Sequence, residues 1–233
     1  MTSDFEAFKA QLNLTRDEIY RELFRENIGL IRIKKEDVAV RNLGRIIEST
    51  LKLASVKGFH AMSLRDLCAD SGLSIGGVYA YIKNKDDLTH LIQSHGFILT
   101  RRTLLACTAG MAPGPDKLFA AVRAHLYLSE MMPAWFSFSF MEAKSLPKKE
   151  KLEAVTTELE IEGILFGIIQ EGITAGKFRR VDARLLASLT KAMMQDWYLK
   201  RRKHRNQGTD VTHYARFVWS VLDCYLRDAT VKR

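Results

Sequence analysis

The stretch ASVKGFHAMSLRDLCADSGLSIGGVYAYIKNKDDL, residues 54–88, contains two short amphipathic helix patterns in succession. The first spans Leu64–Ser71 and the second Ile75–Ile82, with the pair Gly72-Leu73 between them. The apolar residues of each pattern lie on one face at helical spacing. These faces can close on each other and on the apolar stripe of a preceding helix, between Leu43 and Ala54. The stretch therefore predicts a three-helix unit with a helix-turn-helix.

Two serines and two glycines mark where the short helices begin. Ser63 and Ser74 stand at N-cap positions, where a hydroxyl can satisfy free helix amides. Gly76 and Gly77 lie inside the second pattern, although each costs about 0.5–1 kcal/mol relative to Ala in a helix. At the start of a recognition helix, their missing side chains would let the backbone approach phosphates and base edges closely. Taken alone, the glycines fit a frayed loop without a partner equally well.

The glycines are surrounded by cationic side chains and tyrosines, the types that hold phosphates at the rim of a helix-turn-helix. The candidate DNA-binding residues are Arg41, Arg45, Ser63, Arg65, Ser74, Gly76, Gly77, Tyr79, Tyr81, Lys83 and Lys85. We expect Arg65, Tyr81 and Lys85 to be exposed and to contact phosphates.

The same stretch resembles the DNA-binding domain of the TetR (tetracycline-repressor-like) family. The matching residues are Gly58-Phe59, Ser63, Arg65, Gly72-Leu73-Ser74, Gly76, Tyr79, Tyr81, Asn84-Lys85 and Leu88. They cover about a fifth of the chain. Two positions depart from the family pattern: Ile82 replaces the usual Phe, and Ala80 stands where an aromatic residue often faces phosphate. A further departure is the segment of about 38 residues before the first helix of this domain.

The resemblance implies an all-α protein with a three-helix helix-turn-helix DNA-binding domain followed by a helical ligand-binding and dimerisation domain. We expect a helical extension over residues 1–38, the DNA-binding domain over 39–88 and the larger domain over 89–233. The extension is amphipathic and nearly neutral, so we expect it to pack on the protein rather than along DNA.

Helix signals continue through the rest of the chain. Thr15 with Glu18 predicts a capped helix in the extension, and Asn84 predicts the start of a helix that ends near Ala106. The Gly/Pro-rich segment 110–115 predicts a loop. Further helices are expected at 116–131, 134–145, 148–175, 182–204 and 210–227.

Composition narrows the class of protein. The formal net charge of +9 divides into −1 for residues 1–40, +4 for 41–110, +1 for 111–195 and +5 for 196–233. We expect a cytoplasmic protein, because neither a signal peptide nor an 18-residue apolar stretch is present. Cys68, Cys107 and Cys224 are far apart and lack CxxC spacing, so neither a disulfide framework nor a zinc site is indicated. No metal and no cofactor are expected.

Methionines and aromatic residues are concentrated in the C-terminal part and suit a pocket for a long apolar effector. The candidates are Met131, Trp135, Phe136, Phe140, Phe166, Met193 and Trp197. Ordinary core or dimer packing is the alternative. The stretches MEAKSLPKKEKLEAV, EGITAGKF and QDWYLKRRKHRN resemble TetR-family regulators of fatty-acid metabolism that respond to acyl-CoA. The basic run at 200–205 fits either a solvated helix end or a site for a phosphate-bearing ligand.

The last two long helix patterns, 182–204 and 210–227, can pair with their copies across a two-fold axis. The candidate dimer-interface residues are Leu185, Leu189, Phe217, Val221 and Leu222. Folding back on the same chain is the alternative.

We find no catalytic motif among the six scattered histidines and the remaining sequence, so an enzyme is not expected. The predicted function is a homodimeric transcriptional regulator, acting as a repressor on a palindromic double-stranded DNA operator and released by a small hydrophobic effector. No membrane partner is expected. The alternative is a helical small-molecule-binding protein whose helix-turn-helix mediates protein contacts.

Overall fold

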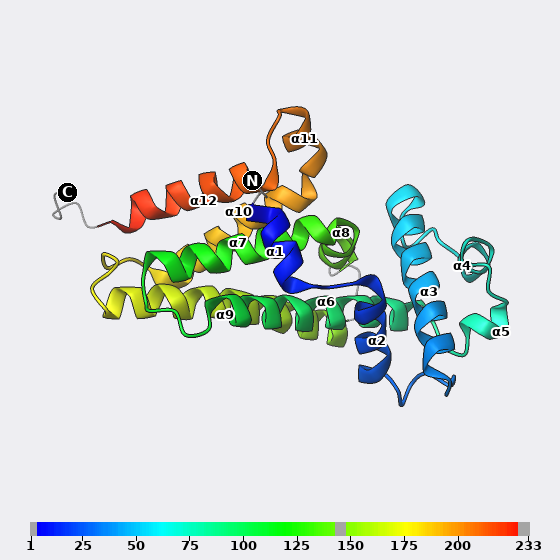
Figure 1. Cartoon of the computed structure of the whole chain (residues 1–233). Coiled ribbons are helices and arrows are strands. Elements are labelled where there is room, and N and C mark those ends of the chain that lie inside the picture. Colours follow the sequence, from blue (N-terminus) through cyan, green and yellow to red (C-terminus); the bar gives the residue numbers. More distant parts are fainter. Residues whose placement is uncertain (1–3, 143–147, 228–233) are drawn as a thin grey trace. The chain divides into compact units, whose positions relative to one another are not determined.

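The computed structural model describes residues 4–142 and 148–227, and for residues 148–158 it describes the backbone alone. Every regular element in these ranges is a helix (Figure 1), which confirms the predicted all-α class. No helix in this part of the chain is long and apolar enough to cross a membrane. The helix break predicted at Pro147 and part of the MEAKSLPKKEKLEAV stretch lie outside the described residues.

The helices form two compact units. Unit 2 comprises residues 12–96 and 134–151, and unit 1 comprises the remaining residues. Helix α6 (Lys85–Thr108) contributes residues to both units. The domain boundaries at residues 38 and 88 stay a prediction, because packing alone does not test which segments fold independently.

Unit 2 contains the predicted three-helix arrangement. Helix α3 (Glu36–Lys57) packs against α4 (Leu64–Ser71), which packs against α5 (Ile75–Val78). Between them lies an apolar core that is essentially inaccessible to water, and its members are Leu43, Ile46, Ile47, Met62, Leu67, Val78, Leu88 and Ile92. Burial of these side chains at about 25 cal/mol per Å² is the main force that holds the short helices α4 and α5 in place.

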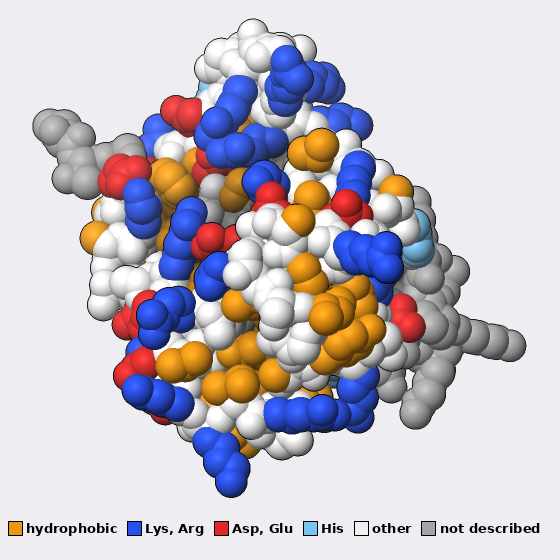
Figure 2. Space-filling view, turned by 90° about the vertical axis from the view of Figure 1, so that its right-hand side faces the viewer, with side chains coloured by type: hydrophobic (Ala, Val, Ile, Leu, Met, Phe, Trp, Pro, Cys, Tyr) orange, Lys and Arg blue, Asp and Glu red, His pale blue; other side chains and the backbone are white. Residues whose placement is uncertain are grey.

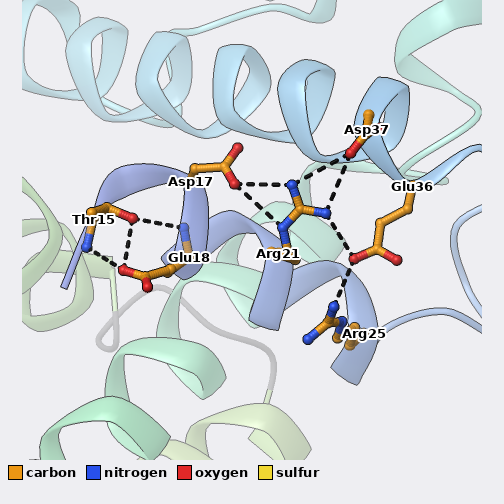
Figure 3. A network of polar contacts seen from close by, with 7 residues as sticks. All are labelled: Thr15, Asp17, Glu18, Arg21, Arg25, Glu36 and Asp37. Carbon is orange, nitrogen blue, oxygen red and sulfur yellow. Dashed lines mark hydrogen bonds and ion pairs between the residues drawn. The ribbon is translucent and has the colours of Figure 1, made fainter. Parts of the chain in front are cut away.

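Helix α2 (Arg16–Glu26) covers the N-terminal half of α3, as expected for an extension that packs on the protein. Its start shows the predicted capping box between Thr15 and Glu18. On the side facing α3, the guanidinium of Arg21 contacts the carboxylates of Glu36 and Asp37 (Figure 3). Arg25 contacts Glu36 as well, 3.0 Å away.

Two further features fix α2 in unit 2. Gly44 lies inside α3 beneath the ring of Tyr20, and a Cβ at this position would be 2.8 Å from the ring. The absence of a side chain at Gly44 therefore lets the two helices approach closely. At the other end of α2, the Glu26 carboxylate lies 2.8 Å from Nδ1 of the buried His95 on α6.

Helix α8 (Pro133–Glu142) also belongs to unit 2, except for its first residue. The indole N–H of Trp135 donates a hydrogen bond to the carbonyl of Ile92, and the ring occupies the space beside Gly96. Phe138 meets Phe59 edge to face at 5.2 Å. Helix α8 therefore supports the side of α6 and the loop that follows α3.

Unit 1 is a helical bundle. Helices α7 (Pro115–Met131), α10 (Ala183–Leu199) and α12 (Val211–Leu226) pack on one another and lie side by side in Figure 1. The long helix α9 (Lys148–Thr174) belongs to unit 1 from residue 152 onward, and its Gly172 gives room to the Phe178 ring of the following turn.

Helix α1 (Asp4–Leu12) belongs to unit 1 except for its last residue, unlike α2. Phe5 and Phe8 both meet the ring of Tyr127 edge to face, at 5.3 and 5.4 Å. Asp4 pairs with Arg216 on α12 at 2.8 Å. The extension that the sequence presented as one segment is thus divided between the two units.

Two predicted helices end earlier than expected. Helix α5 stops at Val78, with Tyr79 as its C-cap, rather than continuing to Ile82. The helix predicted over 182–204 is two helices, α10 and α11 (Arg201–Asn206), because the backbone leaves helical geometry at Lys200.

Candidate nucleic-acid interface

The turn between α4 and α5 has the local geometry that the sequence predicts. Ser63 and Asp66 form a capping box at the start of α4, and Gly72 ends this helix in the left-handed region with φ = 66°. Ser74 accepts a hydrogen bond from the N–H of Gly77, 3.1 Å away, at the start of α5. The hydroxyls of both serines are therefore engaged in capping, and Ser63 also donates to Asp66.

The surface of α5 is open at its first turn. A Cβ at Gly76 would meet nothing within 4 Å in the protein, so the fold itself does not require glycine there. Gly77 differs, because a Cβ would lie 3.2 Å from the Ser74 hydroxyl. Ile75 and Tyr79 are one helical turn apart and are 47% and 42% exposed. An apolar side chain, a tyrosine and bare backbone thus face outward together on α5.

Cationic side chains of unit 2 fall into two groups. Lys52 pairs with Asp70 and Lys57 with Asp66, so these charges are largely neutralised. A second group is exposed and has no ion-pair partner within the described residues, and around α4 and α5 it includes Arg41, Arg45, Arg65 and Lys83. These four charges are screened only by water and salt. A bound polyanion would therefore interact favourably with each of them.

Arg45 links this second group to the turn. Its guanidinium lies over Gly72, where a Cβ would be 2.5 Å from Nη2. Figure 2 views the side of the molecule that carries α4 and α5, and it shows Lys and Arg side chains around exposed hydrophobic ones. This combination suits a nucleic acid, whose phosphates attract the cations and whose thymine methyls accept apolar contacts.

The expected exposure of Tyr81 is wrong. Its side chain is 3% exposed, because α5 ends at Val78 and the following turn directs the ring into the core. Burial raises the pKa of the Tyr81 hydroxyl, and the neighbouring side chain of Asn42 acts in the opposite direction. Tyr81 is therefore a core residue, and we withdraw it from the set that could contact phosphates.

Lys85 is also less exposed than expected. Its ammonium donates to the carbonyls of Phe59 and His60, at 2.6 and 3.2 Å, and lies 4.6 Å from the centre of the Phe59 ring. Burial lowers its pKa, while the charge of Glu142 raises it. These contacts tie the loop after α3 to the start of α6, so Lys85 has a structural role.

One part of the interface was missed in the sequence. The segment before α3 lies against the turn after α5, where the N–H of Arg32 donates to the carbonyl of Ala80 at 2.9 Å. A shallow hollow in unit 2 lies at this junction, and its lining residues are Leu30, Arg32, Tyr79, Tyr81, Ile82, Lys83, Asp87, His90 and Leu91. The cluster Arg32, Lys34 and Lys35 in the sequence is the signal that could have identified it.

The candidate effector residues belong to different units. Trp135, Phe136 and Phe140 lie in unit 2, whereas Met131, Phe166, Met193 and Trp197 lie in unit 1. The two tryptophans are fully packed, with 4% and 0% exposure. Trp197 donates its indole N–H to Glu130 and stacks on His204 at 5.7 Å. Both tryptophans are therefore core residues, while Phe166 and Met193 are half-buried.

The basic run at 200–205 has carboxylate partners inside unit 1. Arg201 and Arg205 both contact the Glu130 carboxylate, which is 8% exposed. Lys200 and His204 both contact Asp196. Arg201 and Arg205 thus join α11 to α7, and Lys200 and His204 pair with the end of α10, so these four side chains have a structural role that neither interpretation of the sequence included.

The candidate dimer residues differ in exposure. Leu185 and Leu189 on α10 are 58% and 54% exposed, and Phe217 and Val221 on α12 are 63% and 44% exposed. Leu222 is 1% exposed and packs inside its own unit, so its assignment to an interface is wrong. The described residues hold no cluster of three or more potential metal ligands.

Comparison with known protein families identifies two regions. Residues 46–97 match "Bacterial regulatory proteins, tetR family", and residues 111–199 match "Tetracyclin repressor-like, C-terminal domain". The comparison with curated protein sequences found no match.

Solved structures share the fold over most of this chain. A tetR-family regulatory protein from Rhodococcus is 23% identical, with a TM-score of 0.70 over 79% of this chain and 97% of that one. The TetR-family regulator PfmR from Thermus thermophilus is 25% identical, with a TM-score of 0.65 over 80% and 100%. FadR from Bacillus subtilis, solved in complex with stearoyl-CoA, is 18% identical, with a TM-score of 0.65 over 78% and 98%.

Proposed function

Because this chain belongs to the TetR family of transcriptional regulators, we propose that it is a homodimeric repressor that binds a near-palindromic operator and is released by a hydrophobic effector. The observation that carries the proposal is the open first turn of α5. There Ile75, Gly76 and Tyr79 face outward beside cations that have no ion-pair partner in the described part of unit 2.

In this proposal α5 enters the major groove. Gly76 lets the backbone approach the DNA, and Ile75 and Tyr79 offer contacts to thymine methyls and sugars. Arg41, Arg45, Arg65 and Lys83 contact phosphates and set the position of α5. Ser63 and Ser74 cap α4 and α5, and so fix the two helix N-termini that we expect to face phosphates.

Dimerisation would use the exposed apolar stripes of α10 and α12. Leu185 and Leu189 repeat at four residues on α10, and Phe217 and Val221 do so on α12. Since α10 and α12 pack on each other, their stripes can form half of a four-helix bundle that a second copy completes. Two copies would then present their α5 helices to half-sites about one helical turn, roughly 34–36 Å, apart.

The effector we propose is an acyl-CoA. Support comes from the methionines and aromatic residues of unit 1 and from the fold shared with FadR of Bacillus subtilis, which was solved with stearoyl-CoA. Phe166 and Met193 are the half-buried members of the predicted set in that unit. For release, the effector must prefer the state that does not bind DNA, by about 10⁴-fold to shift a 1:99 ratio to 99:1.

DNA binding is tested by selecting duplexes from a random library with the purified protein. We expect enrichment of a near-palindromic sequence bound as one dimer. Recovery of unrelated sequences with no enriched motif would contradict the proposal and would favour a helix-turn-helix that mediates protein contacts.

The effector is tested by titrating acyl-CoAs of increasing chain length into the selected complex and following fluorescence anisotropy. Each buried methylene is worth about 0.8 kcal/mol, so affinity should rise about fourfold per methylene until the site is full. Phe166→Ala and Met193→Ala should weaken the response. Failure of every chain length to release DNA would rule out this effector class and leave the DNA-binding proposal standing.

A further inference from the structure

The segment that links α2 to α3, residues 31–35, presents three basic side chains next to the recognition turn. Arg32, Lys34 and Lys35 are exposed, and no ion-pair partner for them occurs among residues 4–142 and 159–227, whose side chains the structure describes. We propose that these residues form a second DNA contact, which binds phosphates beside the half-site that α5 contacts. This inference rests on the proposed DNA binding and extends it to the end of the segment 1–38, which the sequence led us to expect on the protein rather than along DNA.

The backbone holds this segment in place. The N–H of Arg32 donates to the carbonyl of Ala80 at 2.9 Å, directly after Tyr79. Arg32, Tyr79 and Lys83 line the same hollow, so a phosphate near α5 would lie within reach of both elements. The hydrogen bond therefore joins the extension to the element that we expect to enter the groove.

The outward direction of the basic side chains follows from the extended backbone. Successive residues of an extended segment point to opposite sides. Ile31 is 6% exposed and Ile33 is half-buried, so these two anchor the segment on unit 2. Arg32 and Lys34 alternate with them and point outward.

The nearest carboxylates are already occupied. Glu36 and Asp37 follow Lys35 directly and would repel phosphate if their charges were free. Arg21 contacts both of them and Arg25 contacts Glu36, as Figure 3 shows. Helix α2 thus neutralises the acidic start of α3 and leaves the cations of 32–35 unopposed.

Asp87 is the remaining carboxylate that lines the hollow. Its Oδ2 accepts from the N–H of Lys83 at 2.6 Å, and its own N–H donates to Asn84. This carboxylate is therefore part of the cap at the start of α6, and its charge is shared with the helix amides.

The segment is ordered before DNA arrives. Leu23 and Phe24 of α2 are 0% and 2% exposed, and a turn of hydrogen bonds from Leu30 and Ile31 to the carbonyl of Asn27 leads into the segment. Because its position is already fixed, binding loses little conformational entropy, and each phosphate contact adds more to affinity than the same contact from a disordered tail would.

The test compares two triple variants of equal charge. The first is Arg32→Ala, Lys34→Ala, Lys35→Ala. The control is Lys177→Ala, Arg180→Ala, Lys203→Ala, which removes three exposed cations from unit 1. Both should keep the wild-type melting temperature. Binding to the selected duplex is measured from about 50 to 200 mM salt, together with hydroxyl-radical footprints.

We expect the first variant to bind at least tenfold more weakly. The slope of log K against log salt, which is negative, should become less steep by about 2–5, since each phosphate contact contributes about 0.9 and the dimer doubles the number of contacts. Its footprint should lose protection at the outer edge of each half-site. The control should retain the slope and the footprint. If both variants lost affinity and salt dependence equally, the effect would come from net charge alone, and the inference would be overturned.

The outcomes separate the inference from the function on which it rests. If the wild type binds a selected duplex and the first variant keeps its slope and footprint, the inference fails and the DNA-binding function stands. If the wild type binds no duplex at all, the proposed function fails and the inference fails with it.

Discussion

The carboxylate of Glu130 accepts two hydrogen bonds from the guanidinium of Arg201, each 2.7 Å long, and this joins α7 to α11 across the end of unit 1. Arg205 and the indole of Trp197 share the same carboxylate. Burial on its own raises the pKa of Glu130, but the hydrogen bonds and charges of the two arginines outweigh it, so the pKa lies below its usual value.

Glu130→Ala should lower the free energy of unfolding by about 1–3 kcal/mol, because it removes the acceptor of charge-assisted hydrogen bonds from Arg201 and Arg205, whose guanidinium groups stay accessible to water. The exposed pair between Arg16 and Glu48 is the control, and Arg16→Ala should cost less than about 1 kcal/mol. Denaturant unfolding measures both. Because the pKa of Glu130 is lowered, its contribution is present above pH 4.5 and should be lost as pH falls further. Equal small effects of the two variants would show that the Glu130 cluster contributes little.

Unit 1 should lose stability on mild acidification through His125. Burial lowers the pKa of His125 to about 3, and the charge of Lys191 acts in the same direction. Between that value and 6.5 the unfolded chain binds a proton that the folded chain does not, so stability falls as pH decreases through this window. At pH 5 the loss should be about 2 kcal/mol relative to pH 7.5. His125→Gln should flatten this dependence, whereas the same change at the exposed His213 should not. Thermal unfolding at several pH values tests it, and an identical profile for the two variants would contradict the assignment.

Substitution by alanine should have opposite effects on stability at Gly72 and at Gly76. Gly72→Ala places a side chain at φ = 66° against Arg45, so it should cost about 1–2 kcal/mol. Gly76→Ala meets open space and should leave stability unchanged or raise it by up to about 1 kcal/mol. If DNA approaches the backbone at Gly76, this second variant should nevertheless bind the selected duplex at least tenfold more weakly. Wild-type affinity of a folded Gly76→Ala protein would refute close approach at this position.

Lys85 and Arg65 should separate stability from DNA binding. Lys85→Ala removes two hydrogen bonds to the loop after α3 and should cost about 1–3 kcal/mol. Arg65→Ala should leave the melting temperature within a degree or two, because its side chain is exposed, and should weaken binding to specific and nonspecific DNA alike. Calorimetry measures the stability of both variants, and fluorescence anisotropy measures their affinity for DNA. The reverse pattern would assign DNA binding to Lys85 and a structural role to Arg65.

Phe217 and Leu222 should distinguish the interface from the core. Phe217→Asp changes a side chain that is 63% exposed, so the protein should stay folded and become a monomer. Leu222→Asp places a carboxylate at a position that is 1% exposed and should unfold unit 1. Light scattering and circular dichroism report the two outcomes. A folded dimer with Asp at residue 217 would remove the α12 stripe from the proposed interface.

Local signals in the sequence predicted local structure well. Helix α4 has the predicted bounds, and Thr15, Ser63, Ser74 and Asn84 cap helices as expected, because a cap depends on residues only three positions apart. The assignments that depended on tertiary packing were less successful. Tyr81 was assigned to a surface because α5 was extended beyond Val78, and a helix that stops there turns the ring inward.

Helix α12 shows why faces were confused. One apolar stripe, including Val218 and Leu222, packs inside unit 1, and a second, including Phe217 and Val221, is exposed. The two stripes are offset by one residue in the sequence. Apolar periodicity alone does not tell which of them packs inside the same chain and which stays exposed. For the same reason, the sequence did not show that α1 and α2 pack in different units, or that Trp135 is bound to Ile92.

The central claim is that the exposed cations around α5 bind DNA when the protein is a dimer. Hydroxyl-radical footprinting on one selected duplex tests it most directly, with the wild type compared with the variant Arg41→Ala, Arg45→Ala, Lys83→Ala. The account predicts two protected regions about one helical turn apart for the wild type. The variant should remain a folded dimer, lose both protected regions and show a smaller dependence of affinity on salt. A variant with the wild-type footprint and salt dependence would contradict the claim.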